Sequence, residues 1–269
     1  IKESRDKVFE KISERGGYPI TYKNINIEWS NIADQLNETV IQRVIQHDLM
    51  YGEKGKERDA ALLEELFRIC CRYIGQTPSF VIFEREAKRI FGQDINLKKI
   101  NQYLKLIENS MLVKFISPIE MRLKKKKGYP KICLIDHCLR ASWLQEIIPI
   151  DPMALQIAPQ LTDLAGRIAE SVVGSTLSSI YGLDISYAPL RELEPEIDFI
   201  LTIGVKRIPI EVKYQRIIDP YYDTENLRAF IEKSVNNTTF GLLITQLDDS
   251  TVVDPRIVSL PLSTLMLLR

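Results

Sequence analysis

The segment Pro195–Tyr214, PEIDFILTIGVKRIPIEVKY, decides the fold of this chain. It contains two short apolar runs, of which the first carries Asp198 and the second carries Glu211 and Lys213. Alternation in the second run predicts a β-strand with Glu211 and Lys213 on one face. The glycine-containing turn Thr202–Arg207 predicts a hairpin that brings Asp198 close to Glu211. Two carboxylates beside a lysine form a site for a hard cation such as Mg²⁺, because that ion prefers oxygen ligands.

Composition indicates an ordinary globular protein and argues against several classes. The chain has 269 residues, of which 45% are hydrophobic and 27% charged, enough for about two domains with a sizeable core. The net charge is zero, so a nucleic-acid partner would have to bind a local basic patch. The four cysteines form no C-x-x-C pair, which favours a reducing cytoplasm over a disulfide framework or a zinc site. The sequence contains neither a long apolar run nor a signal peptide, so we expect no membrane partner.

The last third of the chain predicts an α/β domain. After a proline-containing linker, we expect a helix over 161–181 with Glu170 on it, then strands over 184–188, the hairpin, a helix over 224–235, and strands over 240–245 and 256–262. This order of elements predicts a mixed sheet with helices on its faces.

Residues 59–145 predict three helices followed by a β-ribbon, which is the layout of a winged helix. The expected helices cover 60–74, 80–91 and 97–109, with Asn96 as the N-cap of the third. The expected strands cover 111–117 and 131–135, on either side of a basic tip.

This region concentrates positive charge. Between Glu84 and Lys131 there are thirteen Lys or Arg residues against five Asp or Glu. Such an excess predicts DNA binding through phosphate contacts. The expected contact residues lie on the third helix and at the tip of the ribbon: Lys98, Lys99, Lys105, Lys124, Lys125, Lys126 and Lys127. Two alternatives remain open, because a lysine run is often a solvated loop and many winged helices bind only proteins.

The hairpin and the helix before it resemble the nuclease fold known by its PD-(D/E)XK motif. Asp198 matches the central aspartate of that motif, and Glu211 with Lys213 matches the Glu-x-Lys pair. Glu170 matches the acid on the first helix of the fold, and Gln215 stands where an auxiliary polar residue is often found. All positions of the motif are therefore filled, in the expected order of elements.

The resemblance implies Mg²⁺-dependent cleavage of phosphodiester bonds. By analogy, Asp198, Glu211 and the carbonyl of Val212 would hold the metal, and Glu170 would orient it or a water molecule. Lys213 would position the attacking hydroxide or stabilise the pentavalent phosphate. The catalytic set implied for this chain is thus Glu170, Asp198, Glu211 and Lys213.

Simpler interpretations of the same residues remain open. Glu211 and Lys213 could form a surface pair on an edge strand, which contributes little to stability, and Asp198 could face solvent. The apolar neighbours Ile197 and Phe199 favour a buried sheet instead, where an unneeded charge is disfavoured. A rival function is an inert nuclease fold that docks a partner protein.

Short motifs along the whole chain carry a second resemblance. They are Arg15–Pro19 (RGGYP), Val44–Leu49, Pro130–Ile132, Asp136 with Leu139–Arg140, and the strand Ile208–Lys213. The chain resembles the C-terminal part of a family of prokaryotic AAA-type P-loop ATPases whose C-terminal domain of unknown function has a nuclease-like core. One departure is His47, at a position where the family usually has an arginine.

The second resemblance implies a division into three units. Residues 1–58 would be a helical remnant of the ATPase lid, 59–145 a winged-helix domain and 146–269 the nuclease-like domain. The sequence contains no G-x-x-x-x-G-K-[ST] motif, so ATP binding is expected upstream of Ile1 in a longer parent protein.

The histidines and the cysteine-rich stretch do not suggest a further catalytic centre. We expect His47 and His137 to be surface or packing residues rather than catalytic bases. Cys133 and Cys138 are expected at a strand end and the start of the next helix, where they would pack as small apolar residues.

Overall fold

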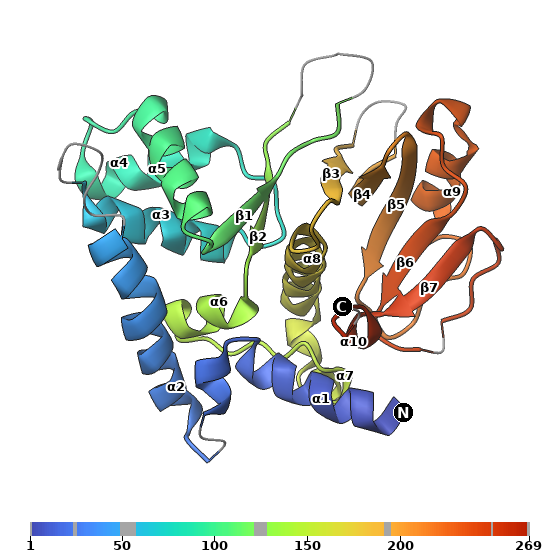
Figure 1. Cartoon of the computed structure of the whole chain (residues 1–269), viewed down its shortest axis with the longest axis horizontal. Helices are drawn as coiled ribbons and strands as arrows, with labels where there is room; N and C mark the ends of the chain where they lie inside the picture. The colour runs from blue at the N-terminus through green and yellow to red at the C-terminus, as the bar shows by residue number, and fades with distance from the viewer. Residues whose placement is uncertain are drawn as a thin grey trace.

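A computed structural model describes residues 2–23, 26–48, 58–120, 128–190, 195–248 and 250–267. Helices and a small two-stranded sheet form one side of the molecule, and a five-stranded sheet forms the other (Figure 1). Helix α8 (Thr162–Ser178) stands between the two sheets. The predicted α/β class, with a mixed sheet flanked by helices, is confirmed. Among the described residues, no helix is both long and apolar enough to cross a membrane.

The N-terminal part is helical, as predicted. Helix α1 (Lys2–Arg15) is followed by the 3₁₀ turn η1 (Pro19–Tyr22) and by α2 (Trp29–Leu36). The chain continues from α2 through the π-helical segments η2 (Asn37–Gln42) and η3 (Val44–Asp48). Ile32, Leu36 and Ile41 are buried along this run, which accounts for the apolar spacing in the sequence.

Three helices and an antiparallel ribbon follow in the order of a winged helix. They are α3 (Ala60–Arg72), α4 (Phe80–Phe91), α5 (Leu97–Asn109), β1 (Val113–Ile116) and β2 (Lys131–Leu134). The side chain of Asn96 caps α5 as predicted, because its Oδ1 accepts a hydrogen bond of 3.0 Å from the Lys99 N–H.

Strand β2 lies in the interior of the molecule. All four of its residues are buried, and the Leu134 N–H donates to Ser171 Oγ of α8 at 2.9 Å. The chain after β1 also reaches the large sheet, since the Ile119 N–H donates to the Tyr187 carbonyl. The ribbon is therefore packed between the helical part and the five-stranded sheet.

The predicted linker contains a short helix. After α6 (His137–Leu144), helix α7 (Pro152–Ile157) begins at a proline, which is tolerated at the first helical position. Asp151 caps α7 by accepting from the N–H groups of Met153 and Ala154. The turn η5 (Pro159–Leu161) then leads into α8.

The large sheet has the strand order β3-β4-β5-β6-β7. Its strands are β3 (Asp184–Ala188), β4 (Ile197–Ile203), β5 (Lys206–Lys213), β6 (Gly241–Thr245) and β7 (Ile257–Pro261). The first three are antiparallel, and β5, β6 and β7 are parallel. Helix α9 (Glu225–Glu232) and the turn η6 (Ser234–Asn236) lie between β5 and β6, and α10 (Leu262–Leu265) follows β7.

The two faces of the sheet are covered by different helices. Phe199 and Ile210 belong to the same apolar cluster as Ile168 of α8. Ile200 and Leu243 pack with Leu227 of α9 in a second cluster. The cluster on the α8 side extends from Phe9 to Leu265 and includes residues of all three predicted units. The boundaries at 58/59 and 145/146 stay predictions.

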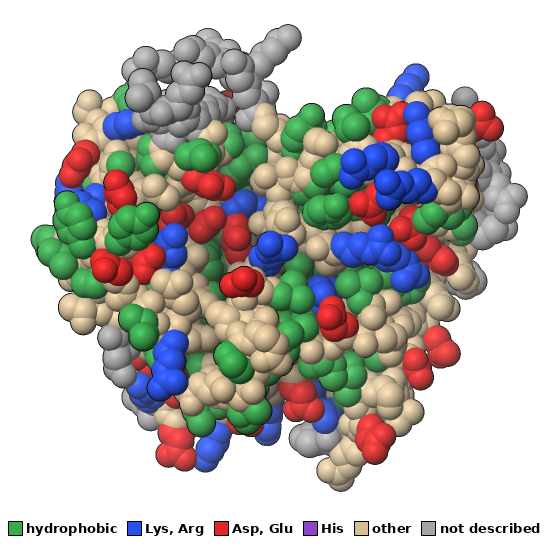
Figure 2. Space-filling model, turned by 180° about the vertical axis from the view of Figure 1, so that it is seen from behind, with side chains coloured by type: hydrophobic (Ala, Val, Ile, Leu, Met, Phe, Trp, Pro, Cys, Tyr) green, Lys and Arg blue, Asp and Glu red, His purple; other side chains and the backbone are tan. Residues whose placement is uncertain are grey.

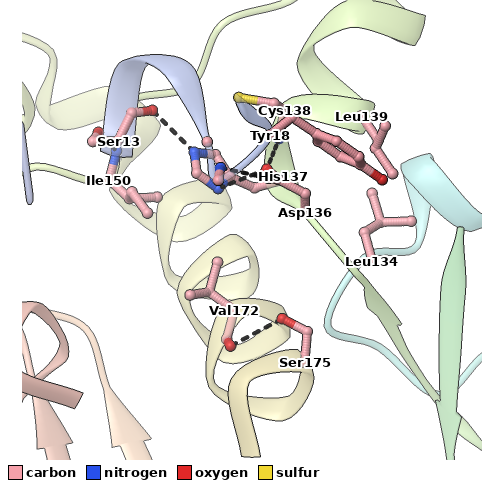
Figure 3. A network of polar contacts seen from close by, with 12 residues as sticks. Ser13, Tyr18, Leu134, Asp136, His137, Cys138, Leu139, Ile150, Val172 and Ser175 are labelled. Atoms are coloured by element: carbon pink, nitrogen blue, oxygen red, sulfur yellow. Dashed lines mark hydrogen bonds and ion pairs between the residues drawn. The ribbon is translucent and has the colours of Figure 1, made fainter. Parts of the chain in front are cut away.

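Two of the sequence motifs meet at the start of α6, in the network of Figure 3. Asp136 caps α6 by accepting from the Cys138 N–H at 2.9 Å, and its other oxygen accepts from the Gly17 N–H at 2.6 Å. His137 is buried, and its Nε2 lies 3.0 Å from the Ser13 carbonyl oxygen. Ser13 Oγ accepts from the Ile150 N–H at 2.9 Å. The network thus joins α1, α6 and the linker, and His137 is a packing residue.

We predict that Gly16→Ala destabilises the protein more than Gly182→Ala. Both glycines have positive φ values, +68° and +84°, which cost an L-residue roughly 1–2 kcal/mol. A Cβ at Gly16 would also overlap Asp136 Oδ1 and Cys138 Sγ, whereas a Cβ at Gly182 meets open space. Urea denaturation should show a loss of at least about 3 kcal/mol for Gly16→Ala and about 1 kcal/mol for Gly182→Ala. Equal losses would contradict the close approach at Asp136.

Candidate functional site

The four residues of the predicted catalytic set line one pocket. Glu170 comes from α8, Asp198 from β4, and Glu211 and Lys213 from β5. The pocket has a volume of about 540 Å³. The convergence that the sequence predicted for these side chains is therefore present in the fold.

The hairpin brings Asp198 and Glu211 together as predicted. The register pairs Phe199 with Ile210, so Asp198 and Glu211 are the next residues along the two strands. The Asp198 N–H donates to Glu211 Oε2 at 3.2 Å, and the Val212 N–H donates to Asp198 Oδ2 at 2.9 Å. Each carboxylate thus bonds to the backbone of the neighbouring strand, which holds both side chains at this end of the hairpin.

Glu211 is the most buried acid of the pocket, with 3% of its surface exposed. Its second oxygen, Oε1, accepts a hydrogen bond of 3.1 Å from Asn226 Nδ2 on α9. Gln215, the expected auxiliary residue, is exposed, and its Nε2 donates to Asp223 instead. Asn226, and not Gln215, therefore contacts Glu211, because α9 packs over the end of β5.

Lys131 is a further charged residue of the site, and sequence reasoning did not assign it there. It lies at the start of β2, only 3% exposed, and its Nζ pairs with Glu170 and with Asp198 Oδ1 at 3.2 Å. The ammonium also lies 4.9 Å from the centre of the Phe199 ring and 5.5 Å from that of Tyr187. From sequence, Lys131 counted toward the basic excess and belonged to the Pro130–Ile132 motif, but neither placed it beside the acids. The signal that could have found it is a lysine at the head of the apolar run KICLI, since a buried charge requires a partner.

Burial and mutual repulsion shift the pKa values of the acids in the pocket. Burial and the Asp198 charge raise the pKa of Glu170 to about 8, against the opposing effect of Lys131. Burial and the Asp198 charge also raise the pKa of Glu211 well above its usual value. For Asp198 burial acts in the same direction, but the charge of Lys131 and the Val212 N–H outweigh it, so its pKa is lowered. Asp198 therefore carries the most firmly held negative charge of the three.

The carboxylates of the pocket are the type of ligand that a hard divalent cation prefers, but their side chains are not arranged around one common position. Four carboxylates line the pocket, those of Glu170, Glu196, Asp198 and Glu211, and two of them have raised pKa values, so the site favours added positive charge. Across the described ranges, however, no group of three His, Cys, Asp or Glu side chains is placed to share an ion. The reason is visible in the contacts: the Lys131 ammonium bridges Glu170 and Asp198, and both Glu211 oxygens accept N–H groups.

The helical part supplies the opposite wall of the pocket. This wall consists of Tyr73, the loop 75–78 between α3 and α4, and Ile82 of α4. The loop is held against β2, because the Gly75 N–H donates to the Ile132 carbonyl and the Ile132 N–H donates to the Gln76 carbonyl. The site thus lies at the seam between the winged-helix region and the sheet.

The structure describes three of the seven lysines that are expected to contact DNA. Lys98 and Lys105 are exposed on α5. Lys99 is partly buried, lies 3.9 Å from Asp59 Oδ2 and stacks over the Tyr103 ring. Lys124–Lys127 lie outside the described residues. On the face seen in Figure 2, basic and acidic side chains are interspersed among hydrophobic ones.

The prediction that Cys133 and Cys138 are packing residues is confirmed. Cys133 in β2 and Cys138 in α6 are buried among apolar residues, and burial raises the pKa of each thiol. A protonated, buried thiol is unreactive, which agrees with a packing role.

A family model described as Domain of unknown function (DUF8612) matches residues 6–147, slightly more than half of the chain. No curated protein matches the sequence. Among solved structures, the crystal structure of protein VC1899 from Vibrio cholerae aligns with 97% of this chain at 13% identity and a TM-score of 0.29. The chain spans about half the length of that protein, covering 53% of it.

We predict that Glu170 makes the metal-free protein less stable as the pH rises. A carboxyl whose pKa is about 8 in the folded chain and 4.5 without the fold keeps its proton more tightly when folded. Each pH unit between these values then costs about 1.4 kcal/mol of stability. Urea denaturation in EDTA between pH 5.5 and 8.5 should show a steeper loss for the wild type than for Glu170→Gln. Glu10→Gln, an exposed substitution on α1, serves as the control, and parallel curves for all three proteins would contradict the raised pKa.

Proposed function

We propose that this chain, which belongs to the family described as Domain of unknown function (DUF8612), binds DNA and cleaves phosphodiester bonds with the help of Mg²⁺. The observation that carries the proposal is the convergence of Glu170, Asp198, Glu211 and Lys213 on one pocket. These residues come from one helix and two strands in the order of a PD-(D/E)XK site. A surface pair on an edge strand would not place a helix acid beside them.

Asp198 and Glu211 are the proposed ligands of the metal, with Glu170 as an assisting acid. The firmly ionised Asp198 would attract the cation, and the backbone bonds of the hairpin would keep Asp198 and Glu211 adjacent. When bound, Mg²⁺ would activate water and offset negative charge on the phosphate.

Lys213 is proposed to act on the reacting phosphate. It lies two residues after Glu211 on β5 and lines the same pocket, half-buried. From there its ammonium would orient the attacking hydroxide and stabilise charge on the phosphate oxygens. Asn226 would hold Glu211 in place through its hydrogen bond to Oε1.

The helical part is proposed to bind the DNA. Three helices and a ribbon have the winged-helix order, and Lys98 and Lys105 are exposed on the third helix. The pocket opens at the seam beside this unit, so a duplex bound there would lie near the acids. In a longer parent protein, an upstream AAA-type ATPase would drive or gate this activity.

A second candidate is an inert nuclease fold that docks a partner protein. Lys131 favours it, because its ammonium already contacts both Asp198 and Glu170, as in a structural ion cluster. The two candidates differ in whether the site turns over DNA, which the first experiment below measures.

Asp198→Ala and Lys213→Ala should each lower plasmid nicking in Mg²⁺ or Mn²⁺ by at least about 100-fold. The first removes a proposed metal ligand, and the second removes the proposed phosphate contact. Asp184→Ala and Lys206→Ala are the matched controls, because both residues are exposed strand positions outside the pocket. Equal nicking by all five proteins would indicate contamination, and an absence of nicking would favour the docking module.

Removing Lys98 and Lys105 together should weaken duplex binding at every sequence tested. Each lost phosphate contact lowers the salt-dependence slope of log K by about 1. The control is Lys7→Ala with Lys11→Ala, which removes two exposed lysines from α1. Fluorescence anisotropy over a series of salt concentrations measures both quantities. An unchanged slope would refute the recognition-helix assignment, and the same assay on alanines at 124–127 tests the tip of the ribbon.

A further inference from the structure

Lys131 lines the acidic pocket and contacts two of its acids without belonging to the proposed catalytic set. It comes from β2, in the ribbon of the helical part, whereas its two carboxylate partners belong to α8 and β4. A lysine this deeply buried costs several kcal/mol unless its charge is paired. Its ion pair with Asp198 and its hydrogen bond to Glu170 offset that cost, and the Tyr187 and Phe199 rings add two cation–π contacts.

The ammonium stands where a cation shared by Glu170 and Asp198 would bind. Asp198 has one oxygen committed to the Val212 N–H and the other, Oδ1, directed at Lys131 Nζ at 3.2 Å. A divalent ion that uses Oδ1 therefore meets a positive charge already in contact with that oxygen. Two cations cannot share this oxygen at such a distance without strong repulsion.

We propose that Lys131 is a built-in competitor of the divalent cation, which holds Glu170 and Asp198 together in the ion-free site and leaves Asp198 when the ion binds. The inference rests on the proposed function, because it concerns the same metal site. Lys131 is a positioning residue in this role, since it acts on the ligands and not on the phosphate.

The surroundings of Lys131 allow such a change. Its side chain has four rotatable bonds, so the ammonium can move off Asp198 while its pairing with Glu170 and the ring contacts retain the charge. Strand β2 also pairs with β1, which follows α5 directly. Any shift of the β1–β2 ribbon on DNA binding would therefore change the contact between Lys131 and Asp198. By linkage, it would also change the affinity of the site for the divalent ion.

The test is the binding of Mn²⁺ alone, measured by isothermal titration calorimetry without DNA. Lys131→Gln keeps a hydrogen-bonding side chain but removes the competing charge, so it should bind Mn²⁺ about tenfold more tightly than the wild type. Lys131→Arg keeps the charge and should bind no more tightly than the wild type. Lys213→Gln removes one positive charge from the same pocket without a contact to Asp198, so its gain should be clearly smaller.

The outcomes separate this inference from the proposed function. If the wild type binds Mn²⁺ and Lys131→Gln binds it with equal or lower affinity, the inference is overturned and the metal site is retained. An equal gain in Mn²⁺ affinity for Lys213→Gln has the same consequence. Binding by neither the wild type nor Lys131→Gln overturns both. Thermal denaturation with and without Mn²⁺ provides a second readout: if Lys131→Gln is poorly folded without metal, a larger Mn²⁺-induced rise in its Tm than in that of the wild type supports competition, and a smaller rise contradicts it.

Discussion

The ion cluster of Lys131 with Glu170 and Asp198 is the contact on which the rest of the site depends. It joins β2, α8 and β4, which belong to distant parts of the chain. Each of the three groups is poorly exposed, so removing Lys131 would leave Asp198 as an uncompensated charge in a region of low dielectric. The cluster therefore couples the helical part to the sheet electrostatically, in addition to the shared apolar core.

The hairpin provides the second constraint. Backbone N–H groups of Asp198 and Val212 donate to the carboxylate of the opposite strand, so the two acids are held just beyond the end of the ladder that pairs β4 with β5. Burial raises the pKa of both acids, but the Lys131 charge and the Val212 N–H outweigh it at Asp198, whose pKa is lowered, while the pKa of Glu211 stays raised. A pair of acids with opposite shifts is typical of functional sites.

The seam position of the pocket connects the two proposed activities. The loop 75–78 and β2 form one wall, and the acids of the sheet form the other. A nucleic acid held by α5 would act on the same ribbon that carries Lys131. Binding and metal loading are thereby proposed to be linked through a single strand.

Local patterns predicted most of the elements. The helices over 80–91 and 97–109 and the strand over 184–188 have the predicted bounds, because apolar periodicity, glycine stops and the Asn96 cap are local signals. The short helix α7 was missed in a proline-containing linker, where the Asp151 cap and a proline at the first helical position are compatible with a helix. Asn226 and Lys131 were missed because their contacts cross long stretches of sequence.

The sequence by itself determined the hairpin, its alternation and hence the pairing of Asp198 with Glu211, since strand period and turn chemistry are properties of neighbouring residues. Only the tertiary structure decided that β2 is buried against α8 and that Lys131 enters the acidic pocket. The physical reason is that a buried charge takes whatever partner the packing of distant elements supplies, and no local pattern encodes that partner.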